Sequence, residues 1–285
     1  MAKQPIPIRG RVVAITGGAR GIGLATATAL ARKGARVAIG DLDLEIAQQA
    51  AERLGGGAVA FDLDVTDRDS FTNFIDSAEA AIGPLDVLVN NAGIMPAGPF
   101  LDESDETAMR QMDINVHGVI LGMKIVLPRM VERNRGHVVN IASQAGKGGF
   151  PGIATYCGTK HAVIGISEAV RGELSETAIE FTVVMPAFVN TELIAGAEQP
   201  RGVKVAEPED VANAIVEALE TPRFDVHVPK SVGRIGYVMN LMPRAGREAI
   251  ARALKADQVL TNIDAGRRAA YEERITHAER SREHA

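Results

Sequence analysis

Short apolar runs alternate with longer amphipathic segments along most of the chain, and several of the runs are rich in valine and isoleucine. Runs with little polar alternation are typical of parallel strands that are covered by helices on both faces. We predict strands over Arg11–Thr16, Arg36–Gly40, Ala58–Asp62, Val87–Asn90, His137–Ile141, Phe181–Met185 and Asp225–Val228.

The amphipathic segments between these runs predict helices, among them Ala25–Lys33, Leu44–Leu54, Asp67–Ala81 and Tyr156–Glu176. Alternating β and α units are joined by right-handed crossovers, so we expect an α/β domain with a doubly wound parallel sheet of about seven strands and helices on both faces. Residues 1–229 hold this domain. Residues 230–285 contain no strand-like run, and we expect a helical C-terminal extension of the same domain.

Composition narrows the class of protein. The 285 residues are 46% hydrophobic and 24% charged, as in ordinary soluble globular proteins. A net charge of −5 gives no general attraction to phosphate backbones, so we expect no nucleic-acid partner. Cys157 is the only cysteine, and the six histidines have no metal-ligand spacing, so we expect neither a disulfide nor a metal site. The chain has no signal-peptide pattern and no run of about 18 apolar residues, so we expect a cytoplasmic protein without a transmembrane segment.

A glycine-rich turn follows the first predicted strand and precedes a helix. Gly17, Gly21 and Gly23 have the spacing G-x-x-x-G-x-G, which differs from the commoner G-x-G-x-x-G fingerprint. Glycines permit a tight turn and let the backbone approach a pyrophosphate at the positive end of the helix. The turn indicates a dinucleotide site; a turn of this composition without a ligand stays the alternative.

Two charged side chains bear on the choice of dinucleotide. Asp41 ends the second strand, where a carboxylate accepts hydrogen bonds from ribose hydroxyls and repels the extra phosphate of NADP. Arg20, inside the turn, favours that phosphate. We expect NAD rather than NADP, because the strand end points at the ribose itself. Asp43 has a simpler explanation as the cap of the next helix.

A tyrosine and a lysine four residues apart, Tyr156 and Lys160, lie on one face of a predicted helix. A free tyrosine has a pKa of about 10, and a neighbouring ammonium favours the phenolate and lowers that pKa. Ser143 follows the strand that ends at Ile141, and doubly wound folds bind their ligands at such strand ends. The three side chains indicate proton exchange with a hydroxyl group.

With these motifs in this order, the sequence resembles the short-chain dehydrogenase/reductase family. The resemblance extends from about Arg9 to Val228 and implies a Rossmann-type fold, an oxidoreductase with a nicotinamide cofactor, and a homodimer or homotetramer. It is carried by Thr16–Gly23, Asp64-Val65, Asn90–Gly93, Asn115, Ser143, Tyr156 and Lys160.

The resemblance implies roles for the matching residues. Tyr156 would be the general acid/base, and Lys160 would lower its pKa and bind the nicotinamide ribose. Ser143 would stabilise the substrate oxygen, and Asn115 would hold a water of the proton relay. Asn90 would tie neighbouring strands together. The implied cofactor-binding residues are Gly17, Arg20, Gly21, Ile22, Gly23, Asp41, Asp64, Val65, Asn91, Ala92, Gly93, Tyr156, Lys160, Pro186, Val189 and Thr191.

Three segments bear on the cofactor channel and the substrate. The family usually has glycine after Pro186, whereas this chain has Ala187, which narrows the allowed backbone angles. Residues 191–205 are expected to form a lid that excludes water. Residues 230–247 mix apolar and basic positions, and we expect them to pack on the protein's own core or on a subunit partner. Two alternatives stay open for this segment: a weak contact with a membrane surface, or a place at the mouth of a lipophilic substrate site.

We expect an apolar substrate pocket formed by Met95, Pro96, Phe150, Pro151 and Phe188.

These observations predict an NAD-dependent oxidoreductase that interconverts a bulky apolar secondary alcohol and its ketone. An NADP-dependent ketone reductase is the alternative within the same class. A cofactor-binding regulator without turnover is the alternative from another class, but a pure sensor needs no proton relay. A sugar-nucleotide epimerase, which also uses a tyrosine and lysine pair, usually needs a longer substrate-binding region.

Overall fold

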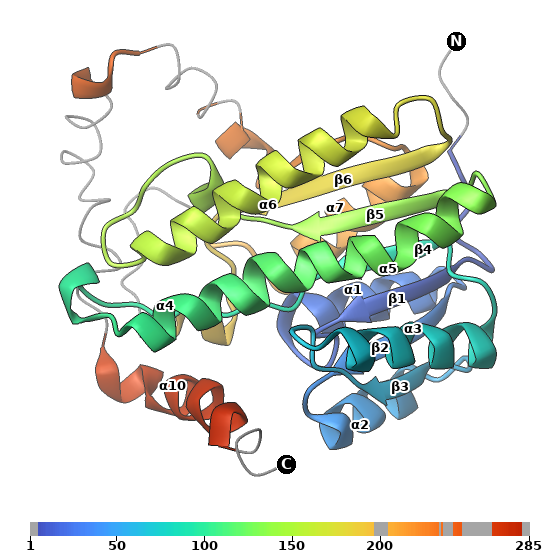
Figure 1. Ribbon diagram of the computed structural model, residues 1–285, viewed down its shortest axis with the longest axis horizontal. Coiled ribbons are helices and arrows are strands. Elements are labelled where there is room, and N and C mark those ends of the chain that lie inside the picture. Colours follow the sequence, from blue (N-terminus) through green and yellow to red (C-terminus); the bar gives the residue numbers. More distant parts are fainter. Residues whose placement is uncertain (1–4, 197–204, 234, 236–241, 247–263, 281–285) are drawn as a thin grey trace.

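A seven-stranded parallel sheet in the order β3-β2-β1-β4-β5-β6-β7 runs through the molecule (Figure 1). The structure, a computed structural model of the chain, describes residues 5–196, 205–233, 235, 242–246 and 264–280. Every neighbouring pair of strands is parallel, which confirms the predicted Rossmann-type doubly wound sheet. The strands are β1 (Val12–Thr16), β2 (Arg36–Asp41), β3 (Val59–Asp62), β4 (Val87–Asn90), β5 (Gly136–Ile141), β6 (Ile179–Pro186) and β7 (Asp225–Val228).

Helices cover both faces of the sheet. On one face, Val13 and Ile15 of β1 share a core with α1 (Gly21–Arg32), α2 (Leu44–Leu54) and α7 (Pro208–Glu220). On the other face, Val12 and Ala14 of the same strand share a core with α3 (Arg68–Ile82), α5 (Gly118–Glu132) and α6 (Ala154–Glu173). Successive strand residues point to opposite faces, and both faces are buried here. The apolar runs therefore lack polar alternation.

Several elements begin or end within a few residues of the predicted positions, and three of these differences are the largest. α1 begins at Gly21 rather than Ala25, because the glycine-rich turn winds directly into the helix. α6 begins at Ala154 and ends at Glu173, which places Tyr156 in its first turn. β6 is longer than predicted and pairs with β5 from Ile179 onward. The topology is unaffected by these shifts.

A continuous helical stretch, Asp105–Glu132, joins α4 (Asp105–Met112), a π-helical turn and α5. By length and composition it is apolar enough to cross a membrane, and the described part of the chain contains no second such helix. Its most apolar window is 56% buried inside the protein, and Val119, Leu121 and Val126 belong to the core on one face of the sheet. The stretch therefore has the character of a core helix.

The last helix that the structure describes, α10 (Ala265–Arg280), lies at the end of the molecule near α4 (Figure 1). Tyr271 and Ile275 of this helix pack on Ile94, and Ile114 and Leu193 flank the same cluster. The expected helical C-terminal extension is confirmed in the described residues, and they hold no strand beyond Val228. The domain boundary at residue 229 stays a prediction.

Candidate active site

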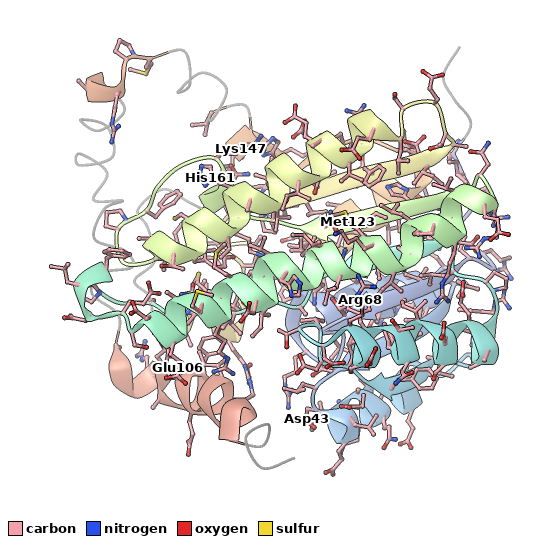
Figure 2. The ribbon with its side chains drawn as sticks, viewed as in Figure 1. Asp43, Arg68, Glu106, Met123, Lys147 and His161 are labelled. Carbon is pink, nitrogen blue, oxygen red and sulfur yellow. The ribbon has the colours of Figure 1, made fainter. Side chains whose placement is uncertain are left out.

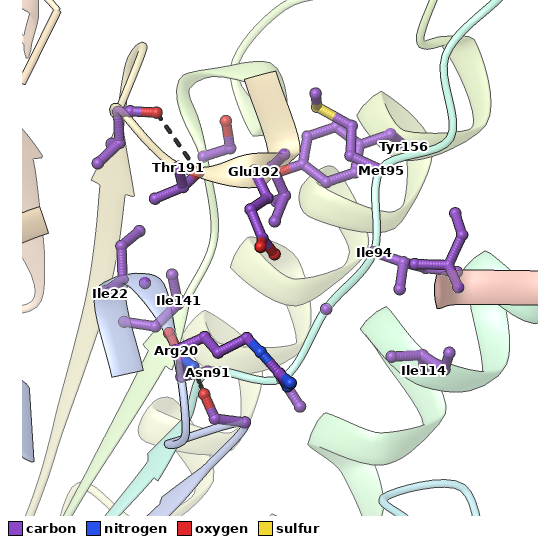
Figure 3. A pocket seen from close by; sticks show the side chains of 18 of the residues that line it. Arg20, Ile22, Asn91, Ile94, Met95, Ile114, Ile141, Tyr156, Thr191 and Glu192 are labelled. Atoms are coloured by element: carbon purple, nitrogen blue, oxygen red, sulfur yellow. Dashed lines mark hydrogen bonds between the residues drawn. The ribbon is translucent and has the colours of Figure 1, made fainter. Parts of the chain in front are cut away.

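The carboxyl ends of the central strands surround a large cavity. β1 and β4 are neighbours in the sheet, but the chain continues from β1 into a helix on one face and from β4 toward a helix on the other. Such a switch point opens a crevice at the strand ends. The cavity measures about 1710 Å³. Figure 3 shows Arg20 and Asn91 on its lower side and Tyr156 and Met95 on its upper side.

The glycine-rich turn presents backbone to this cavity. Gly17 and Gly21 have φ angles of +61° and +51°, which favour glycine. A Cβ on Gly21 would approach Thr191 Cγ2 at 3.5 Å, so glycine keeps the space between the turn and Thr191 open. Gly23 does not line the cavity; a Cβ there would lie 2.3 Å from the Gly17 carbonyl oxygen, so the packing of the turn requires glycine.

The N-terminus of α1 is prepared for an anion. Arg20 occupies the N-cap position without a side-chain hydrogen bond to the helix, and the first turn holds no acidic residue. By contrast, Asp43, Asp67 and Ser104 cap the following helices with their side chains. The first N–H groups of α1 therefore have no side-chain acceptor in the described residues, as a helix end that binds a pyrophosphate requires.

Asn91 holds the turn from the neighbouring strand end. Its Nδ2 donates to the carbonyl oxygens of Thr16 and Gly17, each at 2.9 Å, and its N–H donates to Thr16 Oγ1 at 3.0 Å. The side chain thus shapes the wall of the cavity through the backbone of the turn. Asn90 Nδ2 donates to Asn140 Oδ1 at 2.8 Å, which confirms that Asn90 ties β4 to β5.

The end of β2 brings two carboxylates beside the turn. Asp41 Oδ2 accepts the Ala19 N–H at 3.0 Å, and Asp41 Oδ1 accepts the Asp43 N–H at 3.2 Å. Burial raises the pKa of Asp41, while these two N–H groups and the Arg20 cation oppose the rise. Arg20 is itself ion-paired to Asp43 at 2.7 Å. Asp43 also accepts the Ile46 N–H at 3.3 Å and so caps α2, as predicted (Figure 2).

Most of the other predicted cofactor residues line the same cavity. The alanine after Pro186 is accommodated without strain: its N–H donates to the Val228 carbonyl oxygen at 2.8 Å, and Asn134 is the only described non-glycine residue with a positive φ. The narrowing expected from Ala187 therefore has no structural consequence. The cavity lining includes Ile22, Asp64, Val65, Asn91, Ala92, Gly93, Pro186, Val189 and Thr191.

Tyr156, Lys160 and Ser143 meet on the other side of the cavity. α6 places Lys160 Nζ 5.5 Å from the centre of the Tyr156 ring. Lys160 Nζ donates to the Ile141 carbonyl oxygen at 2.9 Å, which fixes the ammonium at the end of β5. Ser143 follows this strand, and its Oγ accepts the Ala145 N–H at 3.1 Å. The structure brings these three side chains together, and their catalytic roles stay predictions.

Burial acts on the two titratable groups of this cluster in opposite directions. It raises the pKa of Tyr156 above the ordinary value, and the hydrogen bond of Ser143 offsets only part of that rise. It lowers the pKa of Lys160 to about 8. In the protein alone, the pKa of Tyr156 is therefore raised, contrary to the sequence expectation. The physical reason is that loss of solvent disfavours both charged forms more than their proximity favours them.

Asn115 lies behind the cavity rather than in its lining. It belongs to the π-helical turn and is fully buried. Its Oδ1 accepts the Ile94 N–H at 2.8 Å, and its Nδ2 donates to the Ile94 carbonyl oxygen at 2.8 Å and to Thr159 Oγ1 at 3.2 Å. A Cβ on Gly93 would lie 3.1 Å from Asn115 Oδ1 and 3.6 Å from Lys160 Nζ. Asn115 therefore holds the backbone beside Lys160, and its role in binding water stays a prediction.

Three of the five residues expected to form the substrate pocket line the cavity, and their role in binding substrate stays a prediction. Met95, Phe150 and Phe188 line the cavity, whereas Pro96 and Pro151 do not. Each proline follows a lining residue in the sequence, but its own side chain does not reach the cavity. Residues 197–204 of the predicted lid lie outside the described residues, as do residues 234, 236–241 and 247 of the apolar and basic segment.

α10 contributes lining residues that sequence reasoning missed, namely Tyr271, Arg274 and Ile275. A signal was present, because Tyr271 and Ile275 are four residues apart in a strongly charged helical segment and share one helix face. The pattern does not say which surface this face covers. Gln144 was also missed; its Nε2 donates to the Met185 carbonyl oxygen at 2.8 Å at the edge of the cavity.

Comparisons with known proteins agree with this geometry. The profile of the short chain dehydrogenase family matches residues 11–202. The 2-(S)-hydroxypropyl-CoM dehydrogenase 3 of Xanthobacter autotrophicus is 38% identical over 228 residues, which cover 73% of this chain and 89% of that protein. The glycine betaine reductase ATRR of Emericella nidulans is 36% identical over 228 residues, 76% of this chain but 18% of that protein.

A solved structure adds the cofactor. The short chain dehydrogenase/reductase of Burkholderia phymatum, in complex with NAD, matches with a TM-score of 0.76 and 25% identity, covering 82% of this chain and 94% of that one. The family profile spans more than half of the present chain, and the cavity lies at the strand ends where this fold holds dinucleotides. The chain therefore belongs to the short-chain dehydrogenase/reductase family of oxidoreductases, which use a nicotinamide cofactor.

Proposed function

We propose that this protein is an NAD-dependent oxidoreductase that interconverts a secondary alcohol and a ketone, with Tyr156 as its acid/base. One observation carries the proposal: a single cavity contains the Ser143, Tyr156 and Lys160 cluster, the uncapped end of α1 and the carboxylate of Asp41. A hydroxyl-deprotonating group and a dinucleotide cradle in one space are the parts that a dehydrogenase needs.

In the oxidation direction, the substrate hydroxyl binds between the oxygens of Ser143 and Tyr156. The Tyr156 phenolate takes the hydroxyl proton while the carbonyl bond forms and the substrate carbon loses a hydride. A nicotinamide dinucleotide held by the N-terminus of α1 and Asp41 would supply the acceptor for that hydride. Ser143 donates to the substrate oxygen, and the Lys160 ammonium reduces the cost of the phenolate. Ketone reduction is the reverse sequence, with the Tyr156 phenol returning the proton.

The contacts at the end of β2 support NAD over NADP. Each carboxylate oxygen of Asp41 accepts one backbone N–H, from Ala19 or from Asp43. Each oxygen therefore keeps a lone pair that can accept a hydrogen bond from a ribose hydroxyl. The negative charge of Asp41 opposes a phosphate at the same place. Arg20, the residue that would favour NADP, is already paired with Asp43. The glycine betaine and hydroxypropyl-CoM relatives do not bear on this choice.

The surroundings of Tyr156 support a bulky apolar substrate. Met95, Ala145, Ile153 and Cys157 form a buried apolar cluster with the Tyr156 ring. Phe150, Phe188, Leu193 and Ile194 pack against this cluster and also line the cavity. A hydrocarbon skeleton next to the reacting carbon would replace water in this space.

Self-association is part of the proposal. Phe100, Leu101 and Met109 expose 65%, 94% and 61% of their surface; the first two lie in the short helix Phe100–Asp102 and the third in α4, which follows it. Exposed apolar side chains of this size favour a partner surface, and we expect a homodimer or homotetramer. Light scattering coupled to size-exclusion chromatography measures the assembly, and a monomer at micromolar concentration would contradict this part.

The test of the function combines titrations of NAD and NADP with initial rates on a panel of secondary alcohols, from isopropanol to cyclic and steroid alcohols. We expect tighter binding of NAD and turnover that rises with the apolar size of the alcohol. Tighter binding of NADP would transfer the proposal to a ketone reductase. NAD binding without turnover on the whole panel would favour a regulator over an enzyme.

A further inference from the structure

α10 is fastened to two loops that border the substrate side of the cavity. The fastening residue is Arg268, whose side chain is 3% exposed. Its Nη1 donates to the Leu193 carbonyl oxygen at 2.9 Å, and its Nη2 donates to the Met95 carbonyl oxygen. Its Nε donates to Glu272 Oε1 at 2.5 Å, one turn along the same helix. A buried guanidinium with its donors satisfied in this way fixes the helix relative to both loops.

Tyr271 forms a second attachment to the same loop. Its hydroxyl oxygen accepts the Met95 N–H at 2.9 Å, and the residue is buried. The guanidinium carbons of Arg268 and Arg274 lie 4.8 Å and 5.5 Å from the centre of its ring. Cations near a ring face are attracted to it, so the phenol ring has a defined orientation.

Arg274 anchors the next turn of α10. It is ion-paired with Glu192, which begins the short helix Glu192–Ile194 after β6. Its charge also helps to lower the pKa of Asp43, after the larger effect of Arg20, so α10 reaches toward the dinucleotide end of the cavity. The helix therefore borders the cavity and is attached to the neighbouring loops over two turns, from Arg268 to Arg274.

Of the three described α10 residues that line the cavity, Tyr271 and Ile275 present apolar surface and Arg274 is charged. Tyr271 and Ile275 are 4% and 8% exposed and share a cluster with Ile94. Leu193 packs against this cluster and against the apolar cluster that contains Tyr156, so the two clusters are continuous. Figure 3 shows Ile94 next to this helix, between it and the Tyr156 side of the cavity. The wall that faces the reacting tyrosine is thus completed by the C-terminal extension.

We propose that Tyr271 and Ile275 are specificity-determining residues that form the end wall of the substrate pocket and limit the length of the hydrocarbon group on the alcohol or ketone. The assignment rests on the proposed function, because it presumes that the space beside Tyr156 receives the substrate. Arg268 acts through Tyr271 and Ile275 by holding their helix, and it does not touch the substrate.

Size variation at Ile275 tests the wall directly. Ile275→Ala opens space at the end of the pocket, and Ile275→Phe fills it. With methyl ketones from butanone to undecanone and reduced NAD, we expect Ile275→Ala to raise kcat/KM for undecanone relative to butanone by about tenfold, because added methylene groups in an apolar pocket are each worth that order. Ile275→Phe should change the same ratio in the opposite direction. An unchanged ratio in both variants overturns the proposal.

Two controls separate the wall from general effects on the fold. Tyr271→Phe removes the hydroxyl bonded to Met95 but keeps the ring, so the chain-length profile should stay within about twofold of wild type while stability falls. Val131→Ala truncates an exposed aliphatic side chain of α5 outside the cavity lining and should leave the profile unchanged. A profile that moved equally in Val131→Ala would show that Ile275 has no special place.

A binding measurement keeps this assignment separate from the proposed activity. Saturation-transfer NMR on the full-length chain reads binding of the same ketones without turnover. If Ile275→Ala changes the chain-length preference in binding but the protein turns over none of the ketones, the proposed function is wrong and the assignment of Ile275 to the pocket wall stands. If the protein turns over the ketones but wild type and both Ile275 variants have the same binding and rate profiles, the proposed function stands and the assignment of Ile275 to the pocket wall is wrong.

Discussion

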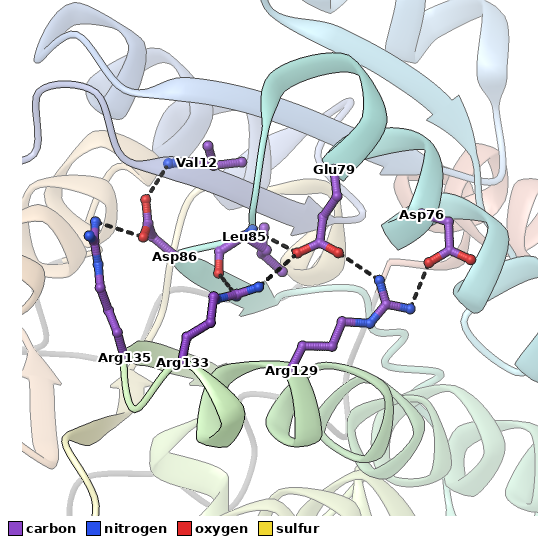
Figure 4. A network of polar contacts seen from close by, with 8 residues as sticks. All are labelled: Val12, Asp76, Glu79, Leu85, Asp86, Arg129, Arg133 and Arg135. Atoms are coloured by element: carbon purple, nitrogen blue, oxygen red, sulfur yellow. Dashed lines mark hydrogen bonds and ion pairs between the residues drawn. The ribbon is translucent and has the colours of Figure 1, made fainter.

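The charged side chains at the two ends of the sheet differ in their partners. At the amino ends of the strands, Glu79 of α3 accepts from Arg129 at 2.7 Å and from the Leu85 N–H at 2.8 Å, and Arg129 also binds Asp76 at 2.6 Å (Figure 4). Asp86 in the same region is paired with Arg135 at 2.8 Å and accepts the Val12 N–H at 3.0 Å. Each of these charges has an opposite partner.

At the carboxyl ends, Arg20 and Asp43 are also paired, but the two ionisable groups at the end of β5, Tyr156 and Lys160, are buried without an opposite charge beside them. Lys160 is 5% exposed and is bonded to a backbone carbonyl oxygen rather than a carboxylate. The pKa values of Tyr156 and Lys160 are displaced toward their neutral forms by burial. Matched charges stabilise the fold, whereas buried groups with displaced pKa values are typical of sites that carry out chemistry. We therefore expect substitutions at the matched charges to change stability, and substitutions at Tyr156 and Lys160 to change activity.

The largest expected effect is at Tyr156. Tyr156→Phe keeps the buried ring but removes the proton-exchanging oxygen, so we expect turnover to fall by about a hundredfold to ten-thousandfold. NAD affinity, measured by titration, should stay within about threefold because the cradle is untouched. Turnover near the wild-type rate would remove Tyr156 from its proposed role and break the comparison at its reactive end.

Next in size is the loss of a matched charge at the other end of the sheet. Glu79→Gln removes one of the two carboxylates that bind Arg129, and we expect the free energy of unfolding, measured by urea denaturation, to fall by about 1–3 kcal/mol. The kcat/KM should be unchanged. Glu132→Gln, at an exposed position of α5, is the matched control and should have little effect. A fall in kcat/KM of Glu79→Gln under conditions where the variant is fully folded would show that the charges at the amino ends of the strands also affect the active site.

The same pair of variants has a defined pH dependence. Burial raises the pKa of Glu79, but the Leu85 N–H and the Arg129 guanidinium outweigh it and hold the pKa below its ordinary value. A carboxyl group with a lowered pKa stabilises the fold above its unfolded value of about 4.3, and this contribution is lost as pH falls through the folded value. The stability difference between wild type and Glu79→Gln should therefore shrink below pH about 4.

A smaller effect is expected at Asp41. Asp41→Asn keeps acceptor capacity on one oxygen but removes the charge, so the ratio of NAD to NADP affinity should shift toward NADP by about tenfold, or 1.4 kcal/mol. Asp43→Asn releases Arg20 from its ion pair and should shift the ratio in the same direction by less. Fluorescence titration of the two reduced cofactors measures both shifts. An unchanged ratio in Asp41→Asn would mean that another group selects the dinucleotide.

The smallest expected effect is the pH response of Lys160 in the cofactor-free protein. Its folded pKa of about 8 lies below the unfolded value of about 10.4. Between these values the unfolded chain holds a proton that the folded chain has lost, so the free energy of unfolding rises with pH. Relative to Lys160→Met, wild type should gain stability from pH 8 to 10 in urea titrations. A flat difference would mean that the buried lysine is matched after all.

Sequence patterns predict the sheet well because burial on both faces leaves a direct mark, as in the uninterrupted apolar run of β1. They predict the glycine-rich turn and the Tyr156–Lys160 pair because each depends on neighbours in sequence. They do not predict the raised pKa of Tyr156, which depends on burial by segments far apart in the chain. The contact of Tyr271 with Met95 joins residues 176 positions apart in the chain, and no local pattern records it.

The way α10 is attached has an evolutionary consequence. Arg268 donates hydrogen bonds to the carbonyl oxygens of Met95 and Leu193. These are backbone atoms, so any residue type at those loop positions would provide them. The helix can therefore change its cavity-facing residues while these backbone contacts persist, and Tyr156 and Lys160 on α6 need not change with it. With the proposed roles of these residues, we expect substrate range and chemistry to be inherited as separable traits, and new substrate preferences to arise first in the C-terminal helix.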